Sequence, residues 1–275
     1  MFDKDANHIG GKMTITWYGR LLRKIIKRLL YSMLCFREGC LVLLGMTKSY
    51  VRFTVEADPP SVFYNFRVNP DCVDELEEYL NLPPGFTLEK MRFFPGDELD
   101  YYISLNVYRV TGITNAVRAE WSVFVWNSEE ETDVVRYMVV EAQSSTVTMD
   151  PVHIFESPGK VEQSLKNNIL KTYVKSFDKT YFEASFAVPS DKLLPVAYAS
   201  KEWLKAIDLI YWPNGIGDRT YYDGAMACAD IMVIPPESVK IKDTTEWSRY
   251  IEPLPDSVLL FPDAIEFVIS PWWNL

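Results

Sequence analysis

The chain contains 275 residues, 48% of them apolar and 14% aromatic, which is enough to bury the core of one large domain or two small ones. Acidic residues outnumber basic residues by 38 to 28, and the net charge of −10 disfavours nucleic-acid binding, because phosphate repels an acidic protein. Four scattered cysteines without a Cys-x-x-Cys pair, and only two histidines, predict neither a structural zinc site nor a disulfide scaffold. We therefore expect a cytoplasmic protein that binds no metal.

Residues 1–46 differ in charge from the rest of the chain. They hold eight Lys and Arg against three Asp and Glu, a net charge of +5, whereas residues 47–275 hold 20 bases and 35 acids, a net charge of −15. Residues 17–33 place apolar side chains at helical spacing among basic ones, which predicts a basic amphipathic helix. This helix can lie on an anionic membrane surface, or the leader can lie outside the fold; we favour the second interpretation.

Residues 47–275 are expected to form a single, mainly β domain of the α+β class. A short strand over residues 62–68 is followed by a helix from Pro70 to about Leu80, in which Asn69 caps the free amides and proline suits the first position. After Pro84 the spacing of apolar residues changes from the helical period of 3.6 residues to the strand period of two. Strands are expected over residues 101–110, 119–126, 134–141, 181–188 and 258–270, with a solvated loop over residues 128–133. Such closely spaced strands favour a closed or partly closed barrel with a few peripheral helices.

Glu120 is a candidate for proton transfer. On an alternating strand it shares a face with Ser122, Phe124 and Trp126, so it is buried if these aromatic side chains face the interior. A buried carboxyl group can give and take protons near neutral pH. The alternative is a solvent-exposed glutamate near a strand end.

Together with the strand from Phe63 to Val68 and the helix after Pro70, three segments resemble the acetoacetate decarboxylase superfamily. They are Arg118-Ala119-Glu120-Trp121, His153-Ile154-Phe155-Glu156-Ser157-Pro158-Gly159-Lys160, and the region from Asp223-Gly224-Ala225-Met226 to Ile231-Met232-Val233-Ile234. Their order, and the 40 positions from Glu120 to Lys160, are similar to the spacing in that superfamily. The resemblance implies a barrel that self-associates into a homo-oligomer and holds a small-molecule site without a cofactor. In the family a lysine forms a Schiff base with the substrate ketone, and a neighbouring lysine lowers its pKa.

The sequence departs from this pattern at the reactive lysine. Gly159 stands where the family has the Schiff-base lysine, and only the second lysine of the pair corresponds to a lysine here, Lys160. His153 replaces a family carboxylate, and Ser61 falls at the position of a family arginine. Ordinary acetoacetate decarboxylation is therefore not expected.

The predicted catalytic residues are Lys160, Glu120 and His153. Lys160 is either a reactive amine in a pocket or an ordinary loop lysine, and His153 is either an acid–base group or structural. Trp212, Arg219 and Tyr221 lie in an aromatic segment that either binds substrate or forms a rigid turn. We expect a lyase-type enzyme that acts on a small keto or unsaturated acid. The alternatives are a non-catalytic barrel that binds an apolar small molecule and a structural protein with a filled interior.

Overall fold

The structure of the protein is a computed structural model. It describes residues 51–82, 84–111, 116–128, 135–145, 157–158, 160–175, 180–190, 193–195, 199–200, 203–204, 209–213, 219–227 and 230–270. Of these, residues 51–54, 157–158, 193, 195, 209–213, 219–227 and 266–270 are described by their backbone alone. All belong to the second of the two units into which the chain divides, residues 48–275. The predicted leader helix and most of the 128–133 loop lie outside the described residues.

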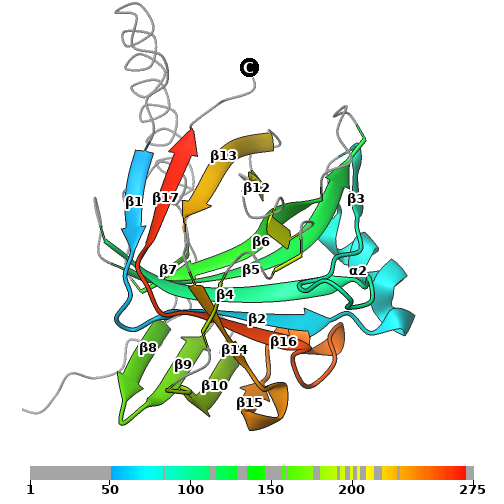
Figure 1. The fold of residues 1–275 in the computed structure, drawn as a ribbon. Coiled ribbons are helices and arrows are strands. Elements are labelled where there is room, and N and C mark those ends of the chain that lie inside the picture. The colour runs from blue at the N-terminus through cyan, green and yellow to red at the C-terminus, as the bar shows by residue number, and fades with distance from the viewer. Residues whose placement is uncertain are drawn as a thin grey trace, which may run out of the picture. The chain divides into compact units, whose positions relative to one another are not determined.

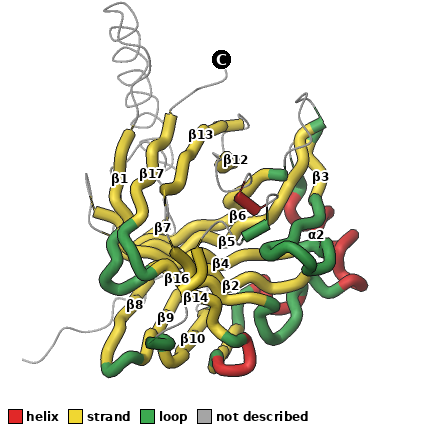
Figure 2. The backbone as a smooth tube through the Cα atoms, in the orientation of Figure 1, coloured by secondary structure: helices red, strands yellow, loops and turns green. Residues whose placement is uncertain are grey.

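Strands dominate the described chain, as the yellow segments of Figure 2 show. The strands are β1 (Val51–Val55), β2 (Ser61–Arg67), β3 (Phe86–Leu88), β4 (Tyr102–Thr111), β5 (Ala116–Asn127), β6 (Arg136–Ser144), β7 (Ser157–Pro158), β8 (Lys160–Lys166), β9 (Ile169–Lys175), β10 (Tyr181–Ala187), β11 (Leu193–Pro195), β12 (Leu209–Pro213), β13 (Arg219–Ala227), β14 (Asp230–Ile234), β15 (Lys240–Asp243), β16 (Ser257–Phe261) and β17 (Ile265–Ser270). The prediction of a mainly β fold is confirmed. Among the described residues, no helix has the length and apolar character needed to cross a lipid bilayer.

The larger sheet follows the order β11-β14-β16-β2-β4-β1-β17-β13-β12-β6-β5-β3, and β4 also pairs with β5. Its pairings are mostly antiparallel; β12 and β7 run parallel to β6. Because β4 pairs with β2, β1 and β5, it lies at the centre of this sheet (Figure 1). The expected barrel remains a prediction.

The smaller sheet has the order β15-β10-β9-β8 and packs on one face of the larger sheet (Figure 1). Their shared core combines residues such as Leu105 and Trp121 of the larger sheet with Phe182 of the smaller one. The Tyr64 hydroxyl reaches across this layer to Thr172 Oγ1, at 2.9 Å. Burial of the phenol in this apolar layer raises the pKa of Tyr64.

The predicted helix begins where the cap was expected. Asn69 Oδ1 accepts a hydrogen bond from the amide of Asp71, at 3.2 Å. The segment divides into a 3-10 turn, η1 (Pro70–Cys72), and the helix α2 (Val73–Leu80). Asn81 follows in the left-handed conformation, with φ of 43°, and ends the helix.

A bulge interrupts the pairing of β5 with β6 between Trp121 and Ser122. Before the bulge, Glu120 lies opposite Ala142; after it, Ser122 lies opposite Val139. One extra residue therefore stands on β6 between these pairs. The β6 residues that share this face are therefore even-numbered on the Glu120 side of the bulge, as Ala142 is, and odd-numbered on the Ser122 side, as Val139 is.

Candidate functional site

A group of buried polar side chains lies on one face of the larger sheet. Asn106 lies directly opposite Glu120, and the neighbouring pairs are Ser104 with Ser122 and Tyr108 with Arg118. Directly opposed residues project to the same side of a sheet. The group, which we call the polar face, consists of Ser61, Asn65, Ser104, Asn106, Tyr108, Arg118, Glu120, Ser122 and Ser144, and each is at most 8% exposed. The alternate residues of β4 and β5 face the smaller sheet, so the two sides of the strands have different chemistry.

The centre of the polar face is an ion pair. Arg118 Nη2 lies 3.2 Å from Glu120 Oε1, and their side chains are 1% and 8% exposed. The Tyr108 hydroxyl donates a hydrogen bond to the same carboxylate oxygen, and the Arg118 guanidinium lies over the Tyr108 ring, 5.9 Å from its centroid. The three side chains form one compact cluster that contains a cation, an anion and a phenol.

Burial of this pair is costly, because both charges lose their hydration. An apolar pair of the same size often stabilises a fold as well as a buried ion pair does, so stability alone does not account for it. Buried charged groups with specific partners are typical of functional sites. Arg118 and Glu120 are therefore the strongest site residues in the described chain.

Several hydroxyl and amide oxygens of the polar face have no hydrogen-bond partner in the part of the chain that the structure describes. They are Ser61 Oγ, Asn106 Oδ1, Ser122 Oγ and Ser144 Oγ. An unmade hydrogen bond at a buried polar atom costs about 1–3 kcal/mol, so such atoms are usually paired. A bound polar ligand would supply these missing partners.

Aromatic rings flank the polar face on the same side of the sheet. Phe63 and Phe261 pack with centroids 4.8 Å apart, and Phe124 and Tyr137 with centroids 4.5 Å apart. Trp203 Nε1 donates to the Tyr137 hydroxyl at 2.9 Å. Burial of this phenol raises the pKa of Tyr137, so it stays neutral and available for hydrogen bonding.

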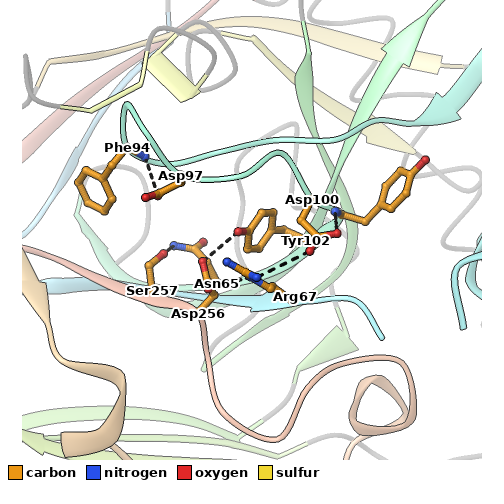
Figure 3. A network of polar contacts seen from close by, with 9 residues as sticks. Asn65, Arg67, Phe94, Asp97, Asp100, Tyr102, Asp256 and Ser257 are labelled. Carbon is orange, nitrogen blue, oxygen red and sulfur yellow. Dashed lines mark hydrogen bonds and ion pairs between the residues drawn. The ribbon is translucent and has the colours of Figure 1, made fainter. Parts of the chain in front are cut away.

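A second polar network joins the ends of β2 and β4 to the segment before β16 (Figure 3). The Tyr102 hydroxyl donates to Asp256 Oδ2 at 2.9 Å, and Arg67 Nε lies 2.8 Å from Asp256 Oδ1. Nearby, Asn65 Nδ2 donates to Ser257 Oγ at 3.0 Å, and Ser104 Oγ donates to Asn65 Oδ1 at 2.6 Å. These contacts link β2, β4 and the segment before β16, so this network holds strands together beside the candidate site.

Glu120 lies on the same buried face as Phe124, which agrees with the expectation from its alternating strand. Lys160 lies elsewhere. It stands on β8 of the smaller sheet with 59% of its side chain exposed, and its Nζ pairs with Glu162 Oε1 at 3.0 Å. The smaller sheet covers the opposite face of β4 and β5, so the larger sheet separates Lys160 from Glu120. A reactive amine in a buried pocket was one of two expectations for Lys160; the described environment is that of an exposed lysine.

The other predicted residues are described less fully. His153 lies outside the described residues. Trp212 stands on β12, opposite Thr220, and Arg219 and Tyr221 stand on β13, all three described by backbone alone. Because β12 also pairs with β6, the fold brings this segment to the sheet that carries Glu120.

Sequence reasoning missed Arg118 and Tyr108. The signal for Arg118 was present, because a residue two positions from Glu120 on a strand must share its face. Tyr108 could be found only from the register that sets it opposite Arg118. Among the described residues, no group of His, Cys, Asp and Glu is arranged to hold a metal ion.

The overall arrangement of these strands is similar to that of known enzymes. The sequence matches no family model and no curated protein. The structure is similar to acetoacetate decarboxylase from Legionella pneumophila subsp. pneumophila str. Philadelphia 1, with 12% sequence identity, a TM-score of 0.54, and coverage of 82% of this chain and 87% of that one. The chain has an acetoacetate decarboxylase-like fold. It is also similar to the enduracididine biosynthesis enzyme MppR, with 10% identity, a TM-score of 0.52, and coverage of 82% and 86% of the two chains.

At these identities the likeness extends to the acetoacetate decarboxylase-like fold and not to the chemistry. It confirms the acetoacetate decarboxylase-like fold that the sequence resemblance implied. The residues of the site must therefore be assigned from their own geometry.

Proposed function

We propose that the polar face binds a small keto or unsaturated acid, and that the protein is a lyase-type enzyme other than a standard acetoacetate decarboxylase. The observation that carries this proposal is the buried cluster of Arg118, Glu120 and Tyr108. It combines the Arg118 guanidinium, which can bind carboxylates, with the Glu120 carboxyl group, which can transfer protons. The unpartnered oxygens of Asn106 and Ser122 beside it support a polar ligand over an apolar one.

The chemistry of the cluster supports a division of roles. Arg118 pairs with the substrate carboxylate, because its five N–H donors can hold Glu120 and a second carboxylate together. Glu120 takes a proton from the carbon next to the keto group, and the electron pair of that C–H bond moves into the carbonyl to form an enolate. The enolate then returns its electron pair to form a carbon–carbon double bond, and a leaving group departs from the next carbon with the pair of its own bond. The proton on Glu120 passes to that leaving group.

This proposal does not use imine chemistry. A Schiff base requires a neutral amine, which family members obtain by placing the lysine in an apolar site. Gly159 has no side chain to react, and Lys160 is exposed and paired with Glu162. Glu120 is therefore the better candidate for the reacting group.

We also propose that the polar face lines the interior of a closed or partly closed barrel. Support comes from the strand pairings, which lead from β4 through β1, β17, β13, β12, β6 and β5 back to β4. In such an arrangement β12 and β13, which carry the segment with Trp212, Arg219 and Tyr221, form part of the barrel wall. The alternate residues of this segment that face the interior can contribute to substrate binding.

Hydrogen–deuterium exchange tests the proton-transfer step directly. The full chain is incubated in D2O with pyruvate, oxaloacetate or acetoacetate, and loss of the proton signal next to the keto group is followed by NMR. We expect exchange above the buffer rate with at least one acid, and a loss of about 100-fold or more in Glu120→Gln, the usual effect of removing a general base. Glu162→Gln, which removes an exposed glutamate, is the matched control and should exchange normally.

Three results would overturn parts of this proposal. Exchange at the buffer rate with every acid, together with saturable binding, would show a binding module without catalysis. Equal losses in Glu120→Gln and Glu162→Gln would show that Glu120 is not the base. Release of carbon dioxide from acetoacetate above the buffer rate would show that decarboxylase activity is retained.

A further inference from the structure

The outer face of the smaller sheet is rich in lysine. Residues that share this face alternate along each strand with the buried core residues Leu170 and Val174 of β9 and Phe182 of β10. Its charged members are Lys160, Lys166, Lys171, Lys175, Lys240 and Lys242, with Glu162 and Glu183 as the acids. We call this set the lysine face. The strands that carry it, β8, β9, β10 and β15, lie in the lower part of Figure 1.

The register brings these lysines together across the four strands. Lys171 of β9 lies opposite Ser164 and Ser185, and Lys240 of β15 also lies opposite Ser185. In the row beside this one, Lys242 lies opposite Glu183. Lys160 lies opposite Lys175 in a further row. Lys160 and Lys175 are therefore like charges directly opposite each other, an arrangement that destabilises a sheet and that an anionic partner would relieve.

The charge of the lysine face contrasts with that of the whole chain. Six lysines and two glutamates give it a net charge of +4, in a protein whose net charge is −10. Of the seven lysines in the described part of the chain, Lys90 alone lies elsewhere. Such segregation is not that of an ordinary solvated surface, where charges of both signs are mixed.

We propose that the lysine face docks on a membrane surface that contains anionic lipids. Clusters of four to eight basic residues are typical of such docking, and lysine is suited to it because its flexible stem follows mobile headgroups without fixed geometry. The sequence of residues 17–33 independently predicts a basic amphipathic helix, an element that binds the same kind of surface.

Nucleic acid fits the lysine face less well. Binding of single strands depends on aromatic rings that are open for base stacking. Here the rings of Tyr173 and Tyr181 pack against each other, 5.9 Å apart, and Lys160 and Lys242 lie over them at 5.3 and 5.0 Å. Both rings are partly buried, and no arginine stands among the charged members of the face to form bidentate contacts with phosphate or bases.

Vesicle binding by the full chain tests this proposal. Co-sedimentation is measured with phosphatidylcholine vesicles, with and without phosphatidylserine, over a range of salt concentrations. We expect binding that requires phosphatidylserine and weakens with salt. The double variant Lys171→Gln with Lys240→Gln should weaken binding by about tenfold to thirtyfold, since each lysine near an anionic bilayer contributes about fivefold. Lys171→Arg with Lys240→Arg should retain binding.

The matched control is Lys90→Gln with Arg109→Gln, which changes the net charge equally through two residues outside the lysine face. It should bind as the parent does. Equal losses of vesicle binding in the two double variants would show that binding depends on net charge alone, and this would overturn the proposal. Undiminished binding in the Lys171 and Lys240 variant would also overturn it, as would a parent that binds duplex or single-stranded DNA but not the anionic vesicles. Circular dichroism and unfolding midpoints should stay unchanged, because both substituted lysines are exposed.

Discussion

Ser104 and Ser122 lie opposite each other on β4 and β5, and the two buried hydroxyl groups differ in their bonding. Ser104 Oγ donates to Asn65 Oδ1 at 2.6 Å, whereas Ser122 Oγ has no partner in the described chain. Replacement of Ser104 by alanine leaves the Asn65 amide oxygen without this hydrogen bond. Replacement of Ser122 removes an atom that is already unpaired. The pair therefore separates a structural hydroxyl from one that is free for a ligand.

We expect Ser104→Ala to lower the free energy of unfolding by about 1–3 kcal/mol, the cost of an unpaired buried acceptor. Ser122→Ala should change it by less than about 0.5 kcal/mol, and should instead weaken binding of a keto acid. Urea denaturation and ligand titration of both variants measure the two effects. Similar stability losses in the two variants would contradict this distinction.

Arg118→Leu should destabilise the protein strongly. It leaves the Glu120 carboxylate buried without its cation, and breaking a buried pair in this way costs about 3–5 kcal/mol. The double variant Arg118→Leu with Glu120→Leu should recover much of that loss, because no isolated charge remains. Unfolding free energies of the parent, both single variants and the double variant complete the cycle. Additive losses would indicate that the two side chains do not interact.

Stability should fall at alkaline pH. Burial raises the pKa of Tyr64 and of Tyr137 above the ordinary value of 10.0. Above that value the unfolded chain releases phenolic protons that the folded chain keeps, so the free energy of unfolding falls by about 1.4 kcal/mol per pH unit for each tyrosine until its raised pKa is reached. Below pH 10 these two groups contribute no pH dependence.

Urea denaturation at a series of alkaline pH values, with tyrosinate absorbance to follow ionisation, measures this dependence. In Tyr137→Phe, the part of the slope of unfolding free energy against pH that comes from the two tyrosines should fall by about half. Ionisation of these phenols in the folded protein near pH 10, without loss of structure, would count against their burial.

Borohydride treatment with keto acids should leave Lys160 unmodified. Its side chain is exposed and pairs with Glu162, so it lacks the apolar surroundings that imine-forming lysines need. Mass mapping of the treated chain, with Lys171 as a comparison lysine on the same sheet, checks this expectation. A reducible adduct found on Lys160 and not on Lys171 would restore the imine mechanism.

Much of the fold could be predicted from local pattern. The expected strands at 62–68, 101–110, 119–126, 134–141 and 181–188 correspond to β2, β4, β5, β6 and β10. The expected strand over residues 258–270 is two strands, β16 and β17, because Pro262 and Asp263 interrupt it. The hairpin of β8 and β9 was missed, since its outer face is polar and its inner face carries few large apolar residues. Its turn signal was present in Asn167 and Asn168, which both take positive φ.

The candidate site was only partly predictable. Glu120 could be found because alternation and superfamily spacing both indicate it. Lys160 was placed near Glu120 by spacing alone, and spacing along a chain does not reveal that a sheet lies between two residues. Arg118 was overlooked because an arginine on a strand is usually solvated. The register of β4, β5 and β6 shows that this one is buried on the same face as a carboxylate.

The bulge between β5 and β6 makes the polar face sensitive to chain length. Tyr137 and Ser144 are an odd number of residues apart, yet the bulge lets both project to the side that carries Arg118. Deletion of Val140 would remove the extra residue and restore a regular ladder, and either Tyr137 or Ser144 would then turn toward the smaller sheet. Within β6, substitutions should therefore be tolerated far better than single-residue insertions or deletions, so relatives that keep this site are expected to vary in length in their loops and not in this strand.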